Sequence, residues 1–395
     1  MSIRVFHVIT SLGRGGAERQ LVNLVSNTNG SEFEHIVCYL REPAPFAEEI
    51  ERGGHKVIGL DLSPRWPWMR APARLIRLLK EHGPDIIQTW LYDADVGSRL
   101  THLGRTKIPI INTLHLTAYE PETIRAANWS RAKVSGLRLI DKLSASLARP
   151  LFVACSHTVM ESAKKNLGIP ASRIQVIYNS IDLETLRTEP GEPARLRREL
   201  GIPETGFVYL NVARLDPQKG QAYLLQAFER VLQRVPQAYL ALVGDGMLAG
   251  ELRQLAGELG ISERVLFLGR RSDVGACLEM ADVFVFPSFF EGLPLAPIEA
   301  MIKGLPCIAS RIGPHVEVIA DEEAGTLITP GSVDELTAAM ERLYGDAARR
   351  RAMAARGQQS ALRRFSNLIV MPQWENLYRE VVPHAGRTGG ALAGR

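Results

Sequence analysis

Two glutamates in the second half of the chain have the spacing of a ligand site. Glu291 and Glu299 are separated by seven residues within the segment PSFFEGLPLAPIEAM, residues 287–301. Glu291 follows an apolar run expected to be a buried strand, and Glu299 lies about one turn inside the next helix. Carboxylates accept hydrogen bonds from hydroxyls, so one extended, hydroxyl-rich ligand could contact both. Two ordinary acids near a helix start, where the helix dipole favours negative charge, explain the pattern equally well.

Two basic residues share a second loop, VARLDPQKG, residues 212–220. Arg214 and Lys219 come just after an expected strand, in a turn made by Asp216 and Pro217. Two cations on one loop at the carboxyl end of a strand suit a diphosphate. A solvated turn before the expected helix 221–235 is the alternative, and for an isolated basic pair it is the commoner case.

A glycine-rich loop, SLGRGGAE, follows the first expected strand at residues 11–18. Glycines at positions 13, 15 and 16 let a ligand approach the backbone, and the amides of a helix starting near Ala17 favour an anion. The spacing differs from the dinucleotide-binding pattern G-x-G-x-x-G, and no acid ends a second strand about 20 residues further on. A tight turn that binds nothing is an equally open interpretation.

Alternating strands and helices must position these loops. The expected strands of the first half are 3–10, 35–40, 56–60, 85–89, 109–113, 151–154 and 174–177. After a linker with a short helix at 183–205, those of the second half are 207–212, 238–243, 265–268, 283–287, 307–310 and 325–328. This alternation predicts an α/β protein with two doubly wound, Rossmann-like domains. Ligands bind beyond the carboxyl ends of such strands, so the cleft between the domains is the expected site.

Composition excludes several classes of protein. The chain has 395 residues with 46% hydrophobic and 23% charged residues, which is typical of globular domains. No apolar run approaches the roughly 20 residues that a membrane-spanning helix needs. The apolar start is interrupted by Arg4, unlike a signal peptide. Four distant cysteines without metal-ligand spacing indicate a reduced, cytoplasmic protein. The net charge of +4 is too small to imply nucleic-acid binding.

Together these motifs resemble the retaining family-4 glycosyltransferases of the GT-B fold, of the kind that builds bacterial surface polysaccharides. The resemblance runs from about residue 3 to about residue 380 and is carried by the glycine loop, the basic pair and the spaced glutamates. Further matching phrases are CSH at 155–157, YNSIDLETL at 178–186, VGDG at 243–246, FLGRRSDV at 267–274, ADVFVFPS at 281–288, GLPCIAS at 304–310 and IGPHVEVI at 312–319.

The resemblance implies a domain plan and a reaction. An acceptor-binding domain would span residues 1–185 and a nucleotide-sugar-binding domain 186–370. A helix at 371–383 would return to the first domain, before a flexible tail at 384–395. A sugar would pass, with retained configuration, from a nucleoside diphosphate to a hydroxyl of a glycan or lipid-linked glycan. Uridine diphosphate sugars are the first choice of donor and guanosine diphosphate mannose the second.

The resemblance also implies roles for single residues. Arg214 and Lys219 would neutralise the diphosphate, Glu299 would hold the ribose, and Glu291 would face the transferred sugar. His115, which follows the strand 109–113, would touch that sugar. The further donor-binding residues would be Gly15, Gly16, Gly244, Arg271, Gly292, Leu293 and Leu295. Glu18 would contribute to the acceptor or donor pocket, or would only complement the helix dipole.

Alternative functions remain open at this point. A nucleotide-sugar 2-epimerase could share two Rossmann-like domains and a uridine diphosphate site, and a sugar phosphorylase is a further enzyme option. A non-catalytic sugar-binding protein is the non-enzyme option, disfavoured because both cations and both carboxylates are present. Glu291 as a covalent nucleophile would follow the retaining hydrolases. The resemblance instead favours substitution on the same face, with the diphosphate taking the acceptor's proton.

A D-x-D pattern at Asp93 and Asp95 could suggest a metal site, because a different glycosyltransferase fold, GT-A, binds its metal with such a pair. Here the pattern opens an expected helix, 94–103, where aspartate is favoured as a cap. The cations for the leaving group already come from Arg214 and Lys219. We therefore expect neither a metal nor any other cofactor, with the nucleotide sugar acting as a substrate.

Basic charge is concentrated in the first half. Residues 1–185 hold 23 Lys and Arg against 18 Asp and Glu, a net of +5. The stretch 65–83 has five basic residues and one acid, with Trp66, Trp68 and Met69 near its start, and 124–149 has six basic residues and one acid, with Trp129. Basic helices with tryptophan at their margin suit an anionic membrane surface. We expect a peripheral enzyme at the inner face of the cytoplasmic membrane; ordinary amphipathic helices packed on a sheet are the alternative.

Overall fold

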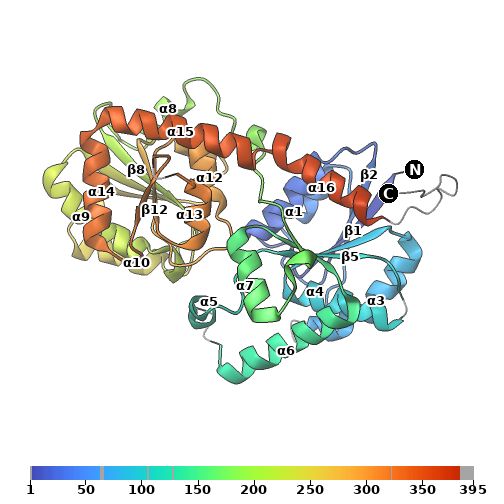
Figure 1. Ribbon diagram of the computed structural model, residues 1–395. Coiled ribbons are helices and arrows are strands. Elements are labelled where there is room, and N and C mark those ends of the chain that lie inside the picture. The colour runs from blue at the N-terminus through green and yellow to red at the C-terminus, as the bar shows by residue number, and fades with distance from the viewer. Residues whose placement is uncertain (1, 63–65, 105, 127–128, 322, 383–395) are drawn as a thin grey trace, which may run out of the picture.

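The computed structural model describes residues 2–62, 66–104, 106–126, 129–321 and 323–382, which form two α/β domains (Figure 1). The expected flexible tail at 384–395 lies outside the described residues. Each domain is built around one parallel sheet, and every expected strand is confirmed to within two residues at either end. The predicted fold class is therefore confirmed.

The sheet of the first domain has the order β3-β2-β1-β4-β5-β6-β7, with all described pairs parallel. The order reverses direction between β1 and β4, and the loops that follow these strands open toward the second domain. The bounds are β1 (Ile3–Ile9), β2 (Phe33–Tyr39), β3 (Lys56–Gly59), β4 (Ile86–Trp90), β5 (Ile110–Leu114), β6 (Leu151–Ala154) and β7 (Ile174–Val176).

The sheet of the second domain has the order β10-β9-β8-β11-β12-β13 and is also parallel in its described pairs. Its strand β11 is buried along its whole length because it is covered on both faces. The bounds are β8 (Phe207–Val212), β9 (Ala238–Val243), β10 (Val265–Gly269), β11 (Val283–Phe286), β12 (Cys307–Ser310) and β13 (Thr326–Ile328).

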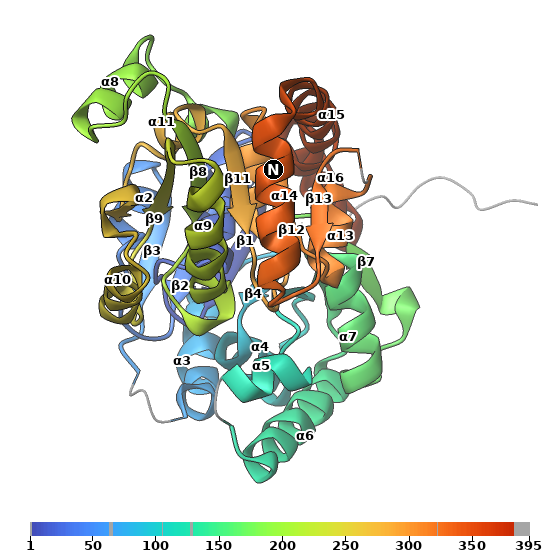
Figure 2. The ribbon, with the colours of Figure 1, turned by 90° about the vertical axis from the view of Figure 1, so that its left-hand side faces the viewer.

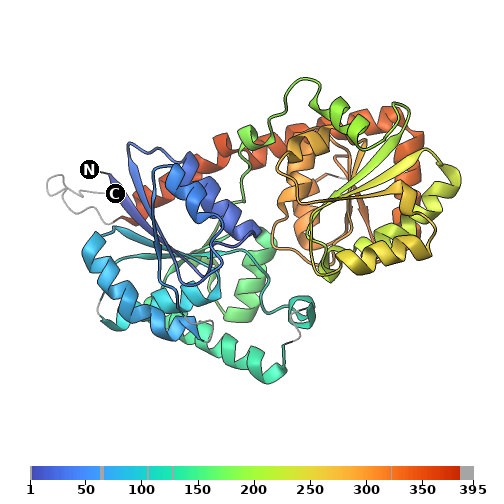
Figure 3. The same cartoon turned by 180° about the vertical axis from the view of Figure 1, so that it is seen from behind.

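Helices cover both faces of each sheet, as Figures 2 and 3 show. In the first domain, α1 and α2 share a core with the returning helix α16 on one face, while α3 and α4 pack on the other. The first domain holds α1 (Gly16–Asn27), α2 (Ala47–Arg52), α3 (Pro67–His82), α4 (Tyr92–Arg99), α5 (Pro121–Ala126), α6 (Arg131–Ala148) and α7 (His157–Leu167). The second holds α8 (Glu192–Glu199), α9 (Gln221–Arg234), α10 (Ala249–Glu258), α11 (Val274–Glu279), α12 (Leu295–Ile302), α13 (Gly313–Ile319), α14 (Val333–Gly345) and α15 (Ala347–Phe365).

The expected helix at 94–103 is present, but it starts two residues earlier than expected, and the prediction that aspartate caps it was wrong. Helix α4 begins at Tyr92 after Leu91, which takes a left-handed φ of 72°, and no side chain caps it. It ends at Arg99 and continues as a 3-10 turn, Leu100–Gly104. Asp95 is buried inside the first turn and accepts a hydrogen bond from the Thr89 hydroxyl at 2.5 Å. The hydrogen bond comes from Thr89 on the buried strand β4, and the sequence pattern around Asp95 gives no indication of it.

The returning helix α16 (Asn367–Val381) ties the two domains together, and begins before the expected boundary at 371. A backbone bridge joins Ile181 to Ser366 where α15 gives way to α16. Further along, the Tyr378 hydroxyl donates to Gln88 Oε1 at 2.5 Å in the core of the first domain. The guanidinium of Arg379 donates to both carboxylate oxygens of Glu32, at 2.6 and 2.7 Å. None of the described helices is long and apolar enough to cross a membrane.

Candidate functional site

A cleft of about 560 Å³ lies between the domains and joins most of the residues singled out from the sequence. The first domain supplies the glycine loop and His115, and the second supplies Arg214, Lys219 and the segment 291–296. A neighbouring compartment of about 480 Å³ contains Arg19, Arg271 and Glu299. Because Leu295 lines both, the two form adjoining parts of one site. The spaced glutamates thus serve different parts, as an extended ligand would require.

The loop after Glu291 is fixed against the first domain by its backbone. A Cβ atom on Gly292 would lie 1.9 Å from the carbonyl oxygen of His115, so only glycine fits there. The Ser156 hydroxyl donates to the carbonyl oxygen of Gly292 at 2.9 Å, and the Asn179 amide donates to that of Leu293 at 3.1 Å. The carbonyls of this loop are therefore turned toward the first domain.

The amides of the same loop are available to a ligand. Within the described chain, the N–H groups of Gly292, Leu293, Leu295 and Ala296 donate to no protein group. The last two begin helix α12, after Pro294. Unpaired amides at a helix start, together with the helix dipole, favour an anion. This end of the cleft can therefore bind a phosphate group through the backbone.

Lys219 and Glu291 form a buried ion pair in the cleft. The Lys219 ammonium lies 2.6 Å from Glu291 Oε1, and the two side chains are only 13% and 9% exposed. The alternative interpretation of this segment as a solvated turn is therefore wrong for Lys219. Its loop is docked against the chain after β11: the Gln218 amide donates to the Phe290 carbonyl at 2.6 Å, and Gly220, with φ of 71°, approaches Pro287 too closely for any side chain.

Arg214 remains accessible at the other side of the cleft. Its side chain is 64% exposed and pairs with Asp216 at 2.8 Å. An exposed guanidinium next to a single carboxylate keeps free donors that point into solvent. Arg214 can therefore contact an incoming anion directly. Lys219 also lines the cleft, with one of its three ammonium donors committed to Glu291.

The glycine loop is partly filled by a neighbouring acid. Gly15 precedes α1, and a Cβ atom there would lie 2.3 Å from Glu18 Oε2, so Glu18 folds back over its own helix start. Burial raises the pKa of Glu18, and the charge of Arg214 opposes that shift. A Cβ atom on Gly16 would meet nothing within 4 Å, so the loop is open to the cleft at this position.

His115 stands at the end of β5 with its ring nitrogens unused. Its ring stacks on Trp90, with centroids 5.1 Å apart and planes inclined by 14°. Both ring nitrogens are buried, and neither has a hydrogen-bond partner among the described residues. Burial lowers the pKa of His115 to about 4, so the ring is neutral near pH 7. A neutral imidazole can donate one hydrogen bond and accept another.

The adjoining compartment contains Glu299, a carboxyl group with a raised pKa. Burial raises the pKa of Glu299 to about 7, and the nearby charge of Arg19 opposes the shift. Arg271, on the same wall, donates two hydrogen bonds to Asp273 at 2.7 and 2.5 Å. Gly244 lines neither part of the site. Its backbone, with a φ of 131°, packs closely against the Ala213 carbonyl, so this glycine supports the loop that carries Arg214.

Several residues at the site were not assigned a role from the sequence. Ser156 and Asn179 lie within the matching phrases CSH and YNSIDLETL, but those phrases gave no indication that the two side chains hold the opposite domain. Two further residues had no assigned role: Gln218, which lies between Arg214 and Lys219 in the sequence, and Arg19, which directly follows the glycine loop. Within the residues that the structure describes, no group of three His, Cys, Asp or Glu side chains could hold a metal ion.

Both halves of the chain match models of known protein families. Residues 14–185 match the family model described as Glycosyltransferase Family 4, and residues 193–360 match that described as Glycosyl transferases group 1. Each model falls within one of the two domains, so together they cover both walls of the cleft.

Individual relatives and structures agree with this result. The UDP-Gal:alpha-D-GlcNAc-diphosphoundecaprenol alpha-1,3-galactosyltransferase of Escherichia coli is 28% identical over 70% of this chain and 71% of its own. The GDP-mannose-dependent alpha-(1-6)-phosphatidylinositol monomannoside mannosyltransferase of Mycolicibacterium smegmatis is 32% identical over 49% of this chain and 53% of its own. The crystal structure of Anabaena Alr3699/HepE in complex with UDP-glucose superimposes with a TM-score of 0.81 and 25% identity, over 96% of this chain and all of that one. The chain belongs to the family-4 glycosyltransferases of the GT-B fold.

Proposed function

We propose that the protein transfers a sugar, with retained configuration, from a nucleoside diphosphate to a hydroxyl of a glycan or lipid-linked glycan in polysaccharide biosynthesis. One observation carries the proposal: Lys219, Arg214 and the unpaired amides of α12 face one cleft, next to the compartment that contains Glu299. This arrangement suits a ligand with a central diphosphate and hydroxylated groups at both ends.

The donor would lie along the two connected parts of the site. Its diphosphate would lie between Arg214 and the start of α12, and its ribose hydroxyls would donate to Glu299. The sugar would then extend toward Glu291 and His115. The UDP-glucose complex of the Anabaena protein and the UDP-Gal named for the Escherichia coli relative support a uridine diphosphate donor. The Mycolicibacterium relative supports guanosine diphosphate mannose as the second choice.

The chemistry would depend on stabilising the leaving diphosphate. Negative charge builds up on that group while the anomeric carbon becomes cationic, so fixed donors in a closed cleft lower the barrier. Glu291 is disfavoured as a nucleophile because Lys219 holds one of its oxygens at 2.6 Å. In the proposed same-face substitution, the acceptor oxygen bonds to the anomeric carbon as the bond to the diphosphate breaks. The acceptor's proton passes to a diphosphate oxygen.

Replacing either cation by alanine should reduce turnover by about 100-fold or more, which is the usual loss for one electrostatic stabiliser. Arg230→Ala, a change to an exposed arginine on α9, is the matched control and should keep wild-type turnover. The measurement is the initial rate of release of nucleoside diphosphate from UDP-sugars. Near-normal rates in both Arg214→Ala and Lys219→Ala would contradict the diphosphate site.

Arg214→Ala and Lys219→Ala should differ in their free energy of unfolding, which urea denaturation measures. Arg214→Ala removes an exposed group and should change the free energy of unfolding by less than about 0.5 kcal/mol. Lys219→Ala leaves the buried Glu291 carboxylate unpaired and should cost about 3 kcal/mol. Adding Glu291→Gln should restore part of that loss without restoring turnover.

Donor affinity should depend on pH through Glu299. If the ionised carboxylate holds the ribose, a pKa of about 7 means that affinity increases as the pH rises through 7. Between pH 6 and pH 8 the ionised fraction, and hence the affinity, should rise about tenfold. Calorimetric titration with UDP-glucose measures this without interference from a titrating terminal phosphate. Glu299→Gln should abolish the dependence; an equal pH slope in variant and wild type would exclude this role.

We propose further that the reaction needs no metal ion, since fixed cations meet the leaving group. Turnover should then be retained in excess EDTA, measured with the same release assay. Loss of activity in EDTA, with recovery on addition of Mn²⁺, would contradict the proposal and restore Asp93 and Asp95 as candidate ligands.

We also propose that the enzyme associates with the cytoplasmic face of a membrane through α3 and α6, which lie at the same end of the first domain in Figures 1 and 2. Along α6, Leu139, Leu143 and Leu147 are 56%, 62% and 47% exposed and recur every four residues on one face. Basic residues flank this leucine face, and α3 exposes Arg70 and Arg77. An apolar face with basic flanks suits an anionic bilayer surface.

Co-sedimentation with vesicles tests the membrane proposal. Binding should require anionic lipid, weaken with added salt, and fall when Leu139, Leu143 and Leu147 become serine or when Arg70 and Arg77 become glutamine. Leu368→Ser is the matched control, because Leu368 is 78% exposed on α16, away from this surface. Equal recovery in the supernatant with neutral and anionic vesicles at low salt would contradict the proposal.

A further inference from the structure

Three adjacent residues at the start of α7 contact the second domain in two places. The Ser156 hydroxyl donates to the carbonyl of Gly292, as described above. The backbone amides of His157 and Thr158 donate to the two carboxylate oxygens of Glu317 on α13, at 2.6 and 3.3 Å. The Thr158 hydroxyl donates to the same carboxylate at 3.3 Å. We call the hydrogen bonds to Glu317 the α7–α13 contact.

The first three amides of α7 depend on groups outside the helix ladder. The Ser156 side chain accepts a hydrogen bond from the third, that of Val159, at 3.1 Å. Glu317 accepts from the first two. Amides at a helix start have no partner within the helix, and the helix dipole favours a negative group there. The carboxylate of one domain therefore stabilises a helix of the other, and can do so only while the domains are in contact.

Glu317 is fixed within the second domain by its own backbone. The guanidinium of Arg364 on α15 donates to the backbone carbonyls of Glu317 and Val318, at 2.7 and 3.1 Å. The carboxylate is therefore presented to α7 from a helix that is itself tied to the long helix α15.

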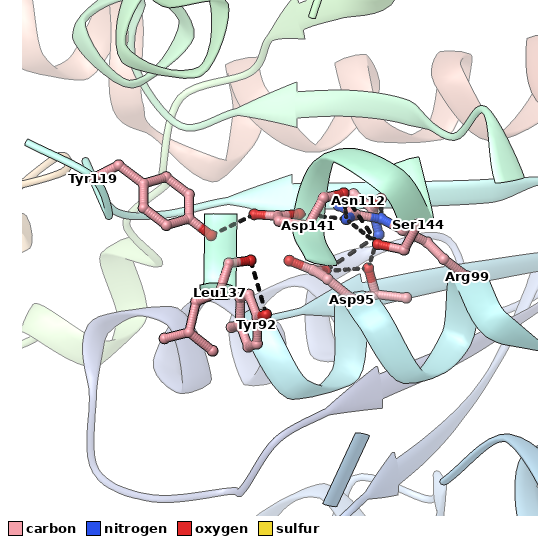
Figure 4. Close-up of polar contacts among 9 residues, drawn as sticks. Tyr92, Asp95, Arg99, Asn112, Tyr119, Leu137, Asp141 and Ser144 are labelled. Atoms are coloured by element: carbon pink, nitrogen blue, oxygen red, sulfur yellow. Dashed lines mark hydrogen bonds and ion pairs between the residues drawn. The ribbon is translucent and has the colours of Figure 1, made fainter. Parts of the chain in front are cut away.

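Helix α7 is fixed in the same way within the first domain. Its residues Ser162 and Asn166 donate to the Glu120 carboxylate, at 3.0 and 2.8 Å. The adjoining Tyr119 donates to Asp141 of α6 at 2.8 Å, within the buried network that joins α6 to α4 (Figure 4). Each partner of the α7–α13 contact therefore belongs to the packed body of its own domain, so the contact joins one domain to the other.

We propose that Glu317 is a positioning residue for the donor site. By accepting the first amides of α7, it holds the second domain where Ser156 can reach the Gly292 carbonyl, and where the free amides of that loop face the cleft. Glu317 lines neither part of the donor site and acts through α7. The inference rests on the proposed function, for which it supplies a contact that keeps both walls of the cleft together.

Replacing Glu317 by alanine tests the proposal. Small-angle X-ray scattering without ligand should give a larger radius of gyration than the wild type, because the domains part more readily. Calorimetric titration with UDP should give a dissociation constant about tenfold higher, as expected for loss of hydrogen bonds to a charged group. Glu317→Gln, which keeps one acceptor oxygen, should have a smaller effect. The matched control is Glu161→Ala, at an exposed acid of α7 that pairs with Lys164; it should keep both wild-type values.

A disulfide across the same contact should rescue the variant. A Cβ atom on Gly313 would lie 3.4 Å from that of Thr158, near the short end of the separations of about 3.5–4.5 Å that disulfides span. The four native cysteines are buried and unpaired, so mild oxidation should join only the introduced pair. In the triple variant Thr158→Cys, Gly313→Cys, Glu317→Ala, oxidation should restore the wild-type radius of gyration and UDP affinity. Reduction of the same sample should remove both.

The possible results separate this proposal from the proposed function. A wild-type radius of gyration or UDP affinity in Glu317→Ala would overturn it. A defect that oxidation of the triple variant leaves unrepaired would also overturn it, since Glu317 would then act only on the stability of its own domain. Failure of both UDP and GDP to bind the wild-type protein would instead contradict the proposed donors, and the scattering comparison, which uses no ligand, would still decide the role of Glu317.

Discussion

The contact between the backbone of Gly292 and the carbonyl of His115 is the constraint on which the site depends. The glycine loop and His115 belong to one domain and the cations and free amides to the other, so the cleft has both of its walls only where the domains meet. The contact needs a residue without a Cβ atom, and Ser156 holds it by bonding to the carbonyl of Gly292. That bond turns the carbonyls away from the cleft and leaves the amides to face it, so domain closure and anion binding have one structural cause.

A series of packed aromatic rings connects His115 through the core of the first domain to helix α16. Trp90, on which His115 stacks, donates to His7 at 3.4 Å, and the His7 ring contacts His35 at 2.8 Å. Burial lowers the pKa of both histidines, so they act as neutral links. The ring of Tyr378 on α16 packs 6.3 Å from that of His35. The helix that joins the domains and the ring at the cleft are therefore parts of one packed core.

The sequence predicted elements better than it predicted side-chain environments. Strand positions and the place of Glu299 one turn inside α12 follow from local apolar patterning, which the structure confirms. The burial of Lys219 depends on a loop more than 70 residues away in the sequence. The hydrogen bonding of Asp95 depends on Thr89 in the neighbouring strand. The position of Glu18 over Gly15 depends on a single rotamer. Such long-range packing and rotamer choices leave no periodic signal in a single sequence.

Burial raises the pKa of two acids at the site, Glu18 and Glu299, and the charges of nearby arginines only oppose these shifts. Lys219 is already neutralised by Glu291, so a bound diphosphate would gain less from it than from the exposed Arg214. Glu18 occupies part of the anion-favouring start of α1, where a second negative group would be repelled. Burial raises its pKa and thereby lowers the cost of the protonated form. If the diphosphate of the proposed donor extends from Arg214 to the glycine loop, Glu18 would have either to take up a proton or to swing away from Gly15, and both changes would remove the competing charge.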